Sequence, residues 1–256
     1  MIQGFSILGD FQLLGKELLC CAGSRNHYNR GMFTGIIEQT GRLVGLEARG
    51  GVRRITVEAP GVADKLREGD SLGISGVCLS ALDLDPTLFH ADLAQETLDK
   101  TSLGALGAGA EVNLELPTAA GSPLGGHVVQ GHVDGCGQLV SLEPVIARND
   151  ARFDEQNTDW TLKVRVPQHV RQWMVPKGSV ALEGISLTIA DFDGEVVTVA
   201  ILPLTYWRTN LHTLKPGSPV NVEGDVVVKL AYTQMMEKHR QQSFDMTEDW
   251  LVSRGF

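Results

Sequence analysis

The sequence predicts an all-β protein that consists of two tandem copies of a small barrel domain followed by a helix. First, the stretch from Ser71 to Glu115 overlays the stretch from Ser179 to Glu223 at a constant offset of 108 residues, without a gap. Second, short runs of alternating apolar and polar residues are separated by Gly, Pro or Asp, which is typical of antiparallel barrels. Third, the apolar spacing after residue 225 becomes that of a helix.

The repeat begins before Ser71, at an offset of 96, so the second copy carries 12 additional residues around 146–159. This insert is polar and charged, and we expect it to form a surface loop. A period near 100 residues suits two tandem globular domains. The matched pairs include Gly35 with Gly131, Gly76 with Gly184, Cys78 with Ser186, Thr97 with Thr205 and Val112 with Val220.

We divide the chain into an extension (1–31), a first barrel (32–127), a second barrel (128–225) and a C-terminal helix with its tail (226–256). The chain has 256 residues and 43% apolar content, enough for two ordinary cores. The extension lacks the basic start and uninterrupted apolar stretch of a signal peptide. It is either a misassigned upstream start or disordered arm, or a targeting segment.

Five runs of the first copy are expected as strands because their residues alternate and turn residues bound them. They span 41–46, 54–59, 71–79, 88–93 and 111–116. Brief helical turns are expected at 62–67, 95–98, 169–174 and 204–209.

The predicted C-terminal helix has one mainly apolar face. Two interpretations stay open: an oligomer contact, or packing on the helix's own barrel. The residues of this face are Val227, Leu230, Ala231, Gln234, Met235 and Lys238.

Composition argues against several classes of function. The net charge of −9 offers no basic stripe for nucleic acid. No apolar run reaches the 18 residues of a membrane span. Cys20, Cys21, Cys78 and Cys136 form no zinc-site spacing or disulfide framework, so a reduced cytoplasmic setting is favoured.

Small polar residues recur on one strand face in both copies. Cys78 and Ser80 share a face in the first copy, as Ser186 and Thr188 do in the second, because side chains alternate along a strand. Such a face is a plausible ligand surface. The alternative is that these groups only satisfy backbone hydrogen bonds.

The segment from Gly125 to Gly135 is the densest motif. Its histidines, His127 and His132, are five apart and face opposite sides of a strand, so a shared metal is disfavoured. Each is an acid or base candidate, or a hydrogen-bonded histidine in a tight crossing between domains. Because Ile36 stands opposite His132 in the repeat, the two pockets differ, which suggests two similar ligands treated differently.

Several motifs, in order and spacing from Met32 to about Asp225, resemble riboflavin synthase of the alpha-chain type. That Met32 begins the family pattern supports a misassigned start for the preceding residues. The motifs are Met32-Phe-Thr-Gly-Ile-Ile, Gly76-Val-Cys-Leu-Ser, Glu96-Thr-Leu-Asp-Lys-Thr-Ser-Leu, Gly125-Gly-His-Val-Val-Gln-Gly-His-Val-Asp-Gly and Gly184-Ile-Ser-Leu-Thr.

The resemblance implies a homotrimer whose subunits carry two six-stranded Greek-key barrels and a trimer-forming helix. Two molecules of 6,7-dimethyl-8-ribityllumazine would meet between the first barrel of one subunit and the second of its neighbour. Transfer of a four-carbon unit would yield riboflavin and 5-amino-6-ribitylaminouracil, without a metal or redox cofactor. The alternative is a relative that binds lumazine or flavin without catalysis, as antenna proteins do.

The resemblance also implies roles for residues. Ser71 and His132 match the proposed proton-transfer residues, and Cys78 matches the proposed nucleophile or water-positioning group. On the N-terminal side, the substrate-binding residues are Gly35, Ile36, Ile37, Cys78, Leu79, Ser80, Asp92, Leu93, Ala94, Gln95, Glu96, Thr97, Gly131, His132 and Val133. On the C-terminal side they are Lys177, Ser186, Leu187, Thr188, Ile201, Leu202, Pro203, Leu204, Thr205 and Tyr206.

The chain departs from the family pattern at a few positions. Ser75 stands where the family usually has Asn, and Ser80 where it has Thr. Leu204 and the Tyr206-Trp207 pair replace a more polar segment, and Leu230 replaces a Tyr.

Overall fold

A computed structural model describes residues 32–119, 121–145, 154, 156–244, 252 and 254. The predicted extension (1–31) and most of the predicted surface loop (146–159) lie outside these residues. Among the described residues, no helix combines the length and apolar character that crossing a membrane requires.

The first sheet contains six antiparallel strands in the order β4-β3-β6-β1-β2-β5. Its two edges meet at an isolated bridge between Leu82 and His90, so the sheet curls toward closure around its own core. The strands are β1 (Gln39–Arg49), β2 (Val52–Glu58), β3 (Ser71–Ile74), β4 (Val77–Ser80), β5 (Leu88–Leu93) and β6 (Glu111–Glu115).

The second sheet repeats this order and closes completely into a barrel, β10-β11-β8-β7-β12-β9, around a separate core. Matching bulges interrupt β1 between Leu43 and Gly45 and β7 between Leu139 and Ser141, as expected of one domain copied. The strands are β7 (Gly135–Pro144), β8 (Trp160–Arg165), β9 (Ser179–Leu182), β10 (Ile185–Phe192), β11 (Val196–Ile201) and β12 (Pro219–Gly224).

The predicted strand 71–79 is wrong in one respect, because the chain reverses at Ser75 and Gly76 and forms the β3–β4 hairpin. Both residues have positive φ, 45° and 81°, as a two-residue hairpin turn of this hand requires. Asn adopts such a φ more readily than Ser does, so the Asn expected from the resemblance would suit this turn better than Ser75. Glu183 and Gly184 form the matching β9–β10 turn, with φ of 50° and 78°.

These two turns meet tip to tip and join the two sheets. A Cβ on Gly76 would lie 2.7 Å from the backbone nitrogen of Gly184. Buried amides tie the contact together, since Asn113 Nδ2 donates to Glu183 O at 2.9 Å and Asn221 Nδ2 donates to Ser75 O at 2.8 Å. The sheets therefore approach at a distance that only glycine backbone permits.

The helical turns form close to their predicted places. They are the 3-10 turns η1 (Ala63–Lys65) and η3 (Arg171–Trp173) and the short helices α1 (Gln95–Lys100) and α2 (Pro203–Arg208). Two further 3-10 turns, η2 (Ser102–Ala105) and η4 (Asn210–Thr213), were not predicted.

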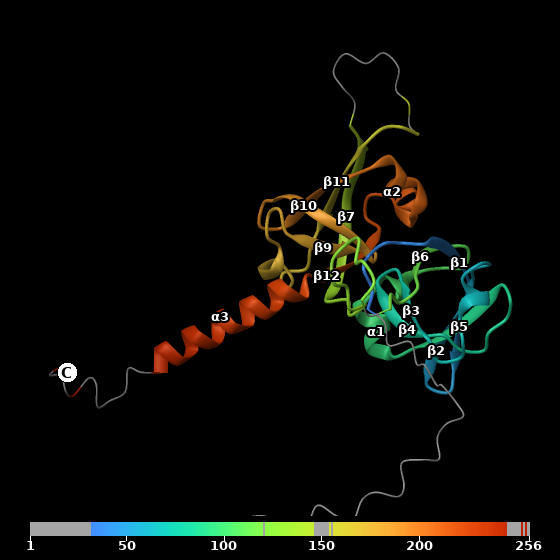
Figure 1. Ribbon diagram of the computed structural model, residues 1–256, viewed down its shortest axis with the longest axis horizontal. Helices are drawn as coiled ribbons and strands as arrows, with labels where there is room; N and C mark the ends of the chain where they lie inside the picture. Colours follow the sequence, from blue (N-terminus) through green and yellow to red (C-terminus); the bar gives the residue numbers. More distant parts are fainter. Residues whose placement is uncertain are drawn as a thin grey trace, which may run out of the picture.

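The C-terminal helix α3 (Val226–Phe244) projects away from both sheets (Figure 1). Its first turns are fixed because Lys229 Nζ lies 2.6 Å from Asp134 Oδ2 and over the ring of Trp173. Beyond this anchor the apolar face is open, and Leu230 is 59% exposed. In this chain the face is therefore not covered by its own barrel.

The contact between the turns predicts the effect of adding one methyl group. Gly76→Ala should lower the free energy of unfolding by about 2–4 kcal/mol, since the new Cβ is strained by its φ and clashes with Gly184. Gly109→Ala is the matched control, because Gly109 has a similar φ of 86° but open space around a Cβ. Urea unfolding of both variants measures the difference. Equal losses would mean that the contact contributes nothing beyond backbone strain.

Candidate active site

Two chain segments cross between the sheets and complete a face on each. The segment 33–37 precedes the first sheet, yet Ser186 N on β10 donates to Gly35 O at 2.8 Å. The segment 129–133 precedes the second sheet, yet Cys78 N on β4 donates to Gly131 O at 2.9 Å. Each face therefore combines a strand of one repeat with backbone from the other.

Both crossings depend on glycine. Gly35 and Gly131 have φ of 75° and 76°, and a Cβ on either would lie 2.6 Å from the Cβ of Ser186 or Cys78, respectively. No amino acid other than glycine can adopt this φ with so close an approach. The matching geometry explains why glycine occupies both positions of the repeat.

The crossings correct one prediction. The sequence assigned Gly35, Ile36 and Ile37 to the face of the first barrel. Instead, Gly35 lies beside Ser186 and Ile37 packs against the core of the second sheet. In the same way, Val133 packs against the core of the first sheet.

The first face brings together two of the predicted catalytic residues. Cys78 is half-buried on β4, and Ser71 lies on the adjacent strand β3, where its hydroxyl acts on the Cys78 thiol. Burial raises the pKa of the Cys78 thiol, which the hydrogen bond from Ser71 only partly offsets, and the nearby Glu223 raises it further. The thiol, rather than the thiolate, is therefore the form present at neutral pH.

His132, the third predicted catalytic residue, directly follows Gly131, so its backbone is brought to the Cys78 face. Its side chain is exposed, and its backbone N–H donates to Glu223 Oε2 at 3.0 Å. An exposed imidazole on a fixed backbone suits proton transfer to a ligand on this face.

The second face carries a different pair. Ser186 Oγ lies 2.7 Å from Nδ1 of His127, while Nε2 of His127 is buried without a hydrogen-bond partner. Burial lowers the pKa of His127, so its imidazole is neutral near pH 7. His127 and His132 thus serve opposite faces, and no group of three or more His, Cys, Asp or Glu side chains in the described part of the chain is arranged to hold a metal.

The other predicted binding residues of the first face lie along β4, the end of β5 and the start of α1. Asp92 is held by Arg54, with N–O distances of 2.6 and 2.8 Å, and this pairing lowers the pKa of Asp92. Leu79 and Leu93 are buried, Thr97 is half-buried, and the exposed members are Ser80, Ala94, Gln95 and Glu96.

On the second face, Tyr206 is buried and its ring stacks on Trp160 at 4.0 Å between centroids. Tyr206, a residue of α2, therefore attaches this helix to Trp160 of β8. Leu187 and Ile201 are also buried, Pro203 and Thr205 are half-buried, and the exposed members are Lys177, Thr188, Leu202 and Leu204.

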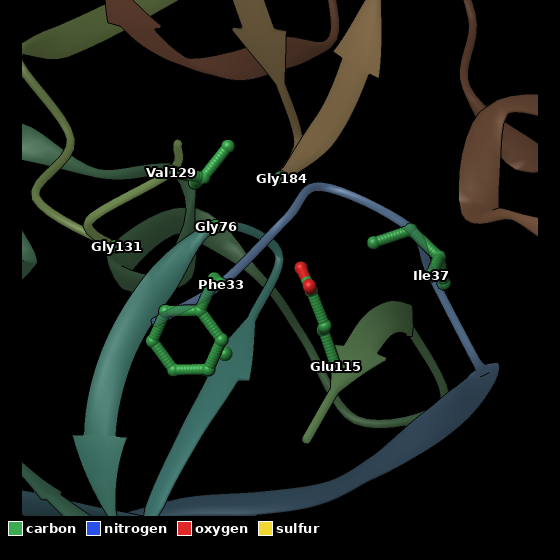
Figure 2. Close-up of a pocket in the computed structure, with 8 residues that line it drawn as sticks. Phe33, Ile37, Gly76, Glu115, Val129, Gly131 and Gly184 are labelled. Carbon is green, nitrogen blue, oxygen red and sulfur yellow. The ribbon is translucent and has the colours of Figure 1, made fainter. Parts of the chain in front are cut away.

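Figure 2 shows the space between the sheets, where the Glu115 side chain lies between Phe33 and Ile37. This cavity of about 10 Å³ holds about one water molecule and is too small for a substrate. The Glu115 carboxylate accepts hydrogen bonds from Thr34 N at 2.6 Å and Gly35 N at 3.0 Å.

Sequence reasoning missed Glu115 and its repeat partner Glu223. Glu115 is the last residue of β6 and Glu223 the next to last of β12, and the two sit at the same repeat position, 108 residues apart. The pattern that could have found them was therefore a carboxylate retained in both copies.

Comparisons with known proteins identify the repeated domain. The sequence model of the family described as the lumazine binding domain matches twice, over residues 34–117 and 130–225. Riboflavin synthase of Actinobacillus pleuropneumoniae is 35% identical over 226 residues, covering 88% of this chain and 100% of that protein. The Mycobacterium tuberculosis H37Rv protein is 39% identical over 203 residues (77% and 95%), and that of Bacillus subtilis 32% over 228 residues (88% and 100%).

Solved structures show the same fold. LumP complexed with 6,7-dimethyl-8-(1'-D-ribityl) lumazine matches with a TM-score of 0.64 and 19% identity, and LumP complexed with riboflavin with 0.66 and 20%. Each match covers 75% of this chain and 99% of the other. With two lumazine-binding domains and this identity over most of its length, the chain belongs to the riboflavin synthase family.

Proposed function

We propose that this protein converts two molecules of 6,7-dimethyl-8-ribityllumazine into riboflavin and 5-amino-6-ribitylaminouracil. One molecule transfers a four-carbon unit to the other, so the donor supplies what the acceptor gains. No external oxidant or metal is part of this proposal. Family membership and the identity to riboflavin synthases support it.

One observation carries the proposal: two faces with the same backbone plan bear unlike reactive groups. Cys78 with Ser71 and His132 occupies one face, and Ser186 with His127 occupies the other. A reaction between two identical molecules needs them held alike but treated differently. Holding both also replaces a bimolecular encounter by a fixed geometry.

The residues fit the steps of such a transfer. The C7 methyl group of one lumazine loses a proton, and a nucleophile adds at C7 of the other. We assign proton transfer to His132. The protonated thiol of Cys78, with Ser71 beside it, favours the positioning of a water molecule over direct attack by sulfur.

The same proposal includes a homotrimer and a cytoplasmic location. The open apolar face of α3 supports assembly, because an exposed face of this kind is typical of an oligomer contact. Each pocket would then lie between the first sheet of one subunit and the second sheet of its neighbour. Cys78 and Cys136 are free thiols, which fits a reducing compartment.

The direct test incubates the purified protein with 6,7-dimethyl-8-ribityllumazine and no added cofactor. We expect the lumazine absorbance to fall and one riboflavin to appear for every two lumazines consumed. Tight binding without riboflavin would instead assign the protein to the non-catalytic, flavin- or lumazine-binding class.

Removal of the imidazole of His132 should slow the reaction. His132→Ala is expected to lower kcat by about 10²-fold, the usual contribution of a positioned acid or base. Because the side chain is exposed, the unfolding temperature should stay unchanged. Turnover close to that of the unmodified protein would exclude His132 from proton transfer.

The apolar face of α3 predicts which substitutions should dissociate the trimer into monomers. Leu230→Glu places a charge on this face and should give monomers in sedimentation velocity. Met236→Glu makes the same kind of change on the opposite side of the helix, where Met236 is 48% exposed, and should leave the trimer intact. A trimer that survives Leu230→Glu would argue against assembly through this face.

A further inference from the structure

The carboxylate of Glu223 holds three consecutive backbone amides. Its Oε1 accepts from Gln130 N at 2.7 Å, and its Oε2 accepts from Gly131 N at 3.1 Å and His132 N at 3.0 Å. The residue is 3% exposed. Hydrogen bonds from several amides to one ionised carboxylate are short and strong, so this segment has one well-defined position.

The same segment is held from the opposite side by the first sheet, since Cys78 N donates to Gly131 O at 2.9 Å. Glu223 belongs to β12 of the second sheet. The backbone that carries His132 is thus fixed between a carboxylate of one sheet and the strand that carries Cys78 in the other. Displacement of this backbone would move His132 relative to the Cys78 face.

One cation lies close enough to compensate the buried charge. Burial raises the pKa of Glu223, while the hydrogen bonds from Gln130 N and His132 N and the charge of Lys229 at the start of α3 lower it; Asp134 acts in the same direction as burial. Lys229 reaches this region through Asp134, whose Oδ2 also accepts from Gly224 N at 2.8 Å. Among the described residues, the charged or titratable side chains that act on Glu223 are Lys229 and Asp134, and Glu223 in turn acts on the Cys78 thiol.

We propose that Glu223 is a positioning residue for the reaction, which fixes His132 and Gly131 against Cys78, and that Lys229 of α3 supports its ionised form. This inference rests on the proposed function. It assigns the second sheet a direct part in the chemistry of the first face, and it links that face to the helix proposed for assembly.

The repeat offers a matched control. Glu115 holds the other crossing segment through Thr34 N, Thr34 Oγ1 and Gly35 N, with the same carboxylate chemistry. Segment 33–37 carries Ile36 at the repeat position where segment 129–133 carries His132. Loss of either carboxylate loosens a crossing, but only Glu223 acts on the histidine.

The test compares Glu223→Gln and Glu115→Gln, each alone and combined with His132→Ala. Glutamine keeps the shape, but one of its terminal atoms is a donor and cannot accept an N–H. Glu223→Gln should lower kcat by about 10- to 100-fold, as expected for misplacement of a catalytic group, with a smaller change in KM. In the His132→Ala background, Glu223→Gln should lower kcat by less than about a further 2-fold. Any loss of kcat that Glu115→Gln causes alone should be the same in that background.

Amide hydrogen exchange gives a result that does not depend on turnover. Residues 130–132 should exchange faster in Glu223→Gln and stay protected in Glu115→Gln, in which residues 34 and 35 should exchange faster instead. If the unmodified protein makes no riboflavin, the proposed function fails, while the exchange pattern still decides whether Glu223 fixes the segment.

A second variant covers the case in which Glu223→Gln does not fold. Lys229→Met leaves the carboxylate but removes the cation that lowers its pKa, so protonation extends to higher pH. The acidic limb of kcat should then move to higher pH. Unchanged kcat in Glu223→Gln, an undiminished loss in the His132→Ala background, or unchanged exchange at residues 130–132 would each overturn the proposal.

Discussion

The crossing of two backbone segments between the sheets is the constraint on which the rest of this structure depends. Residues 33–37 and 129–133 each leave one repeat and pair with a strand of the other, at Ser186 and Cys78. They can do so because the hairpin turns at Gly76 and Gly184 bring the sheets into direct backbone contact, which the buried amides of Asn113 and Asn221 reinforce. Neither repeat contains a complete face, so the two cannot act independently.

The same hydrogen bonds hold both faces, which leaves their side chains free to differ. Gly35 and Gly131 make equivalent bonds, and Glu115 and Glu223 anchor equivalent segments. On this shared frame one face presents a thiol and the other a hydroxyl paired with an imidazole. For the proposed reaction, this difference distinguishes two identical substrates without a change of scaffold.

Much of the fold could be predicted because the repeat is visible in the sequence. Strands, turns and the final helix follow from alternation and spacing. The run 71–79 was predicted as one strand because Ser75 is not a typical left-handed turn residue, although Gly76 is. A turn here was detectable only from the reversal it causes in three dimensions.

The site was harder to predict than the fold. Alignment of the repeats places Gly35 with the first barrel, while tertiary structure sends it to the second, and a linear comparison contains no information about such a crossing. Glu223 was overlooked because an acidic residue at a strand end usually faces solvent. The predicted catalytic residues Ser71 and Cys78 were brought together, as their positions on neighbouring strands allow.

The central claim is that each face is completed by the segment that precedes the other sheet. It is tested most directly by titrating Gly131→Ala and Gly35→Ala with a non-reacting lumazine analogue that lacks the 6- and 7-methyl groups. The account predicts two binding events per chain in the unmodified protein. Gly131→Ala should remove the event that Cys78→Ala also perturbs, and Gly35→Ala the event that Ser186→Ala perturbs. If Gly35→Ala instead removed the site at Cys78, the crossing would not form the faces as described.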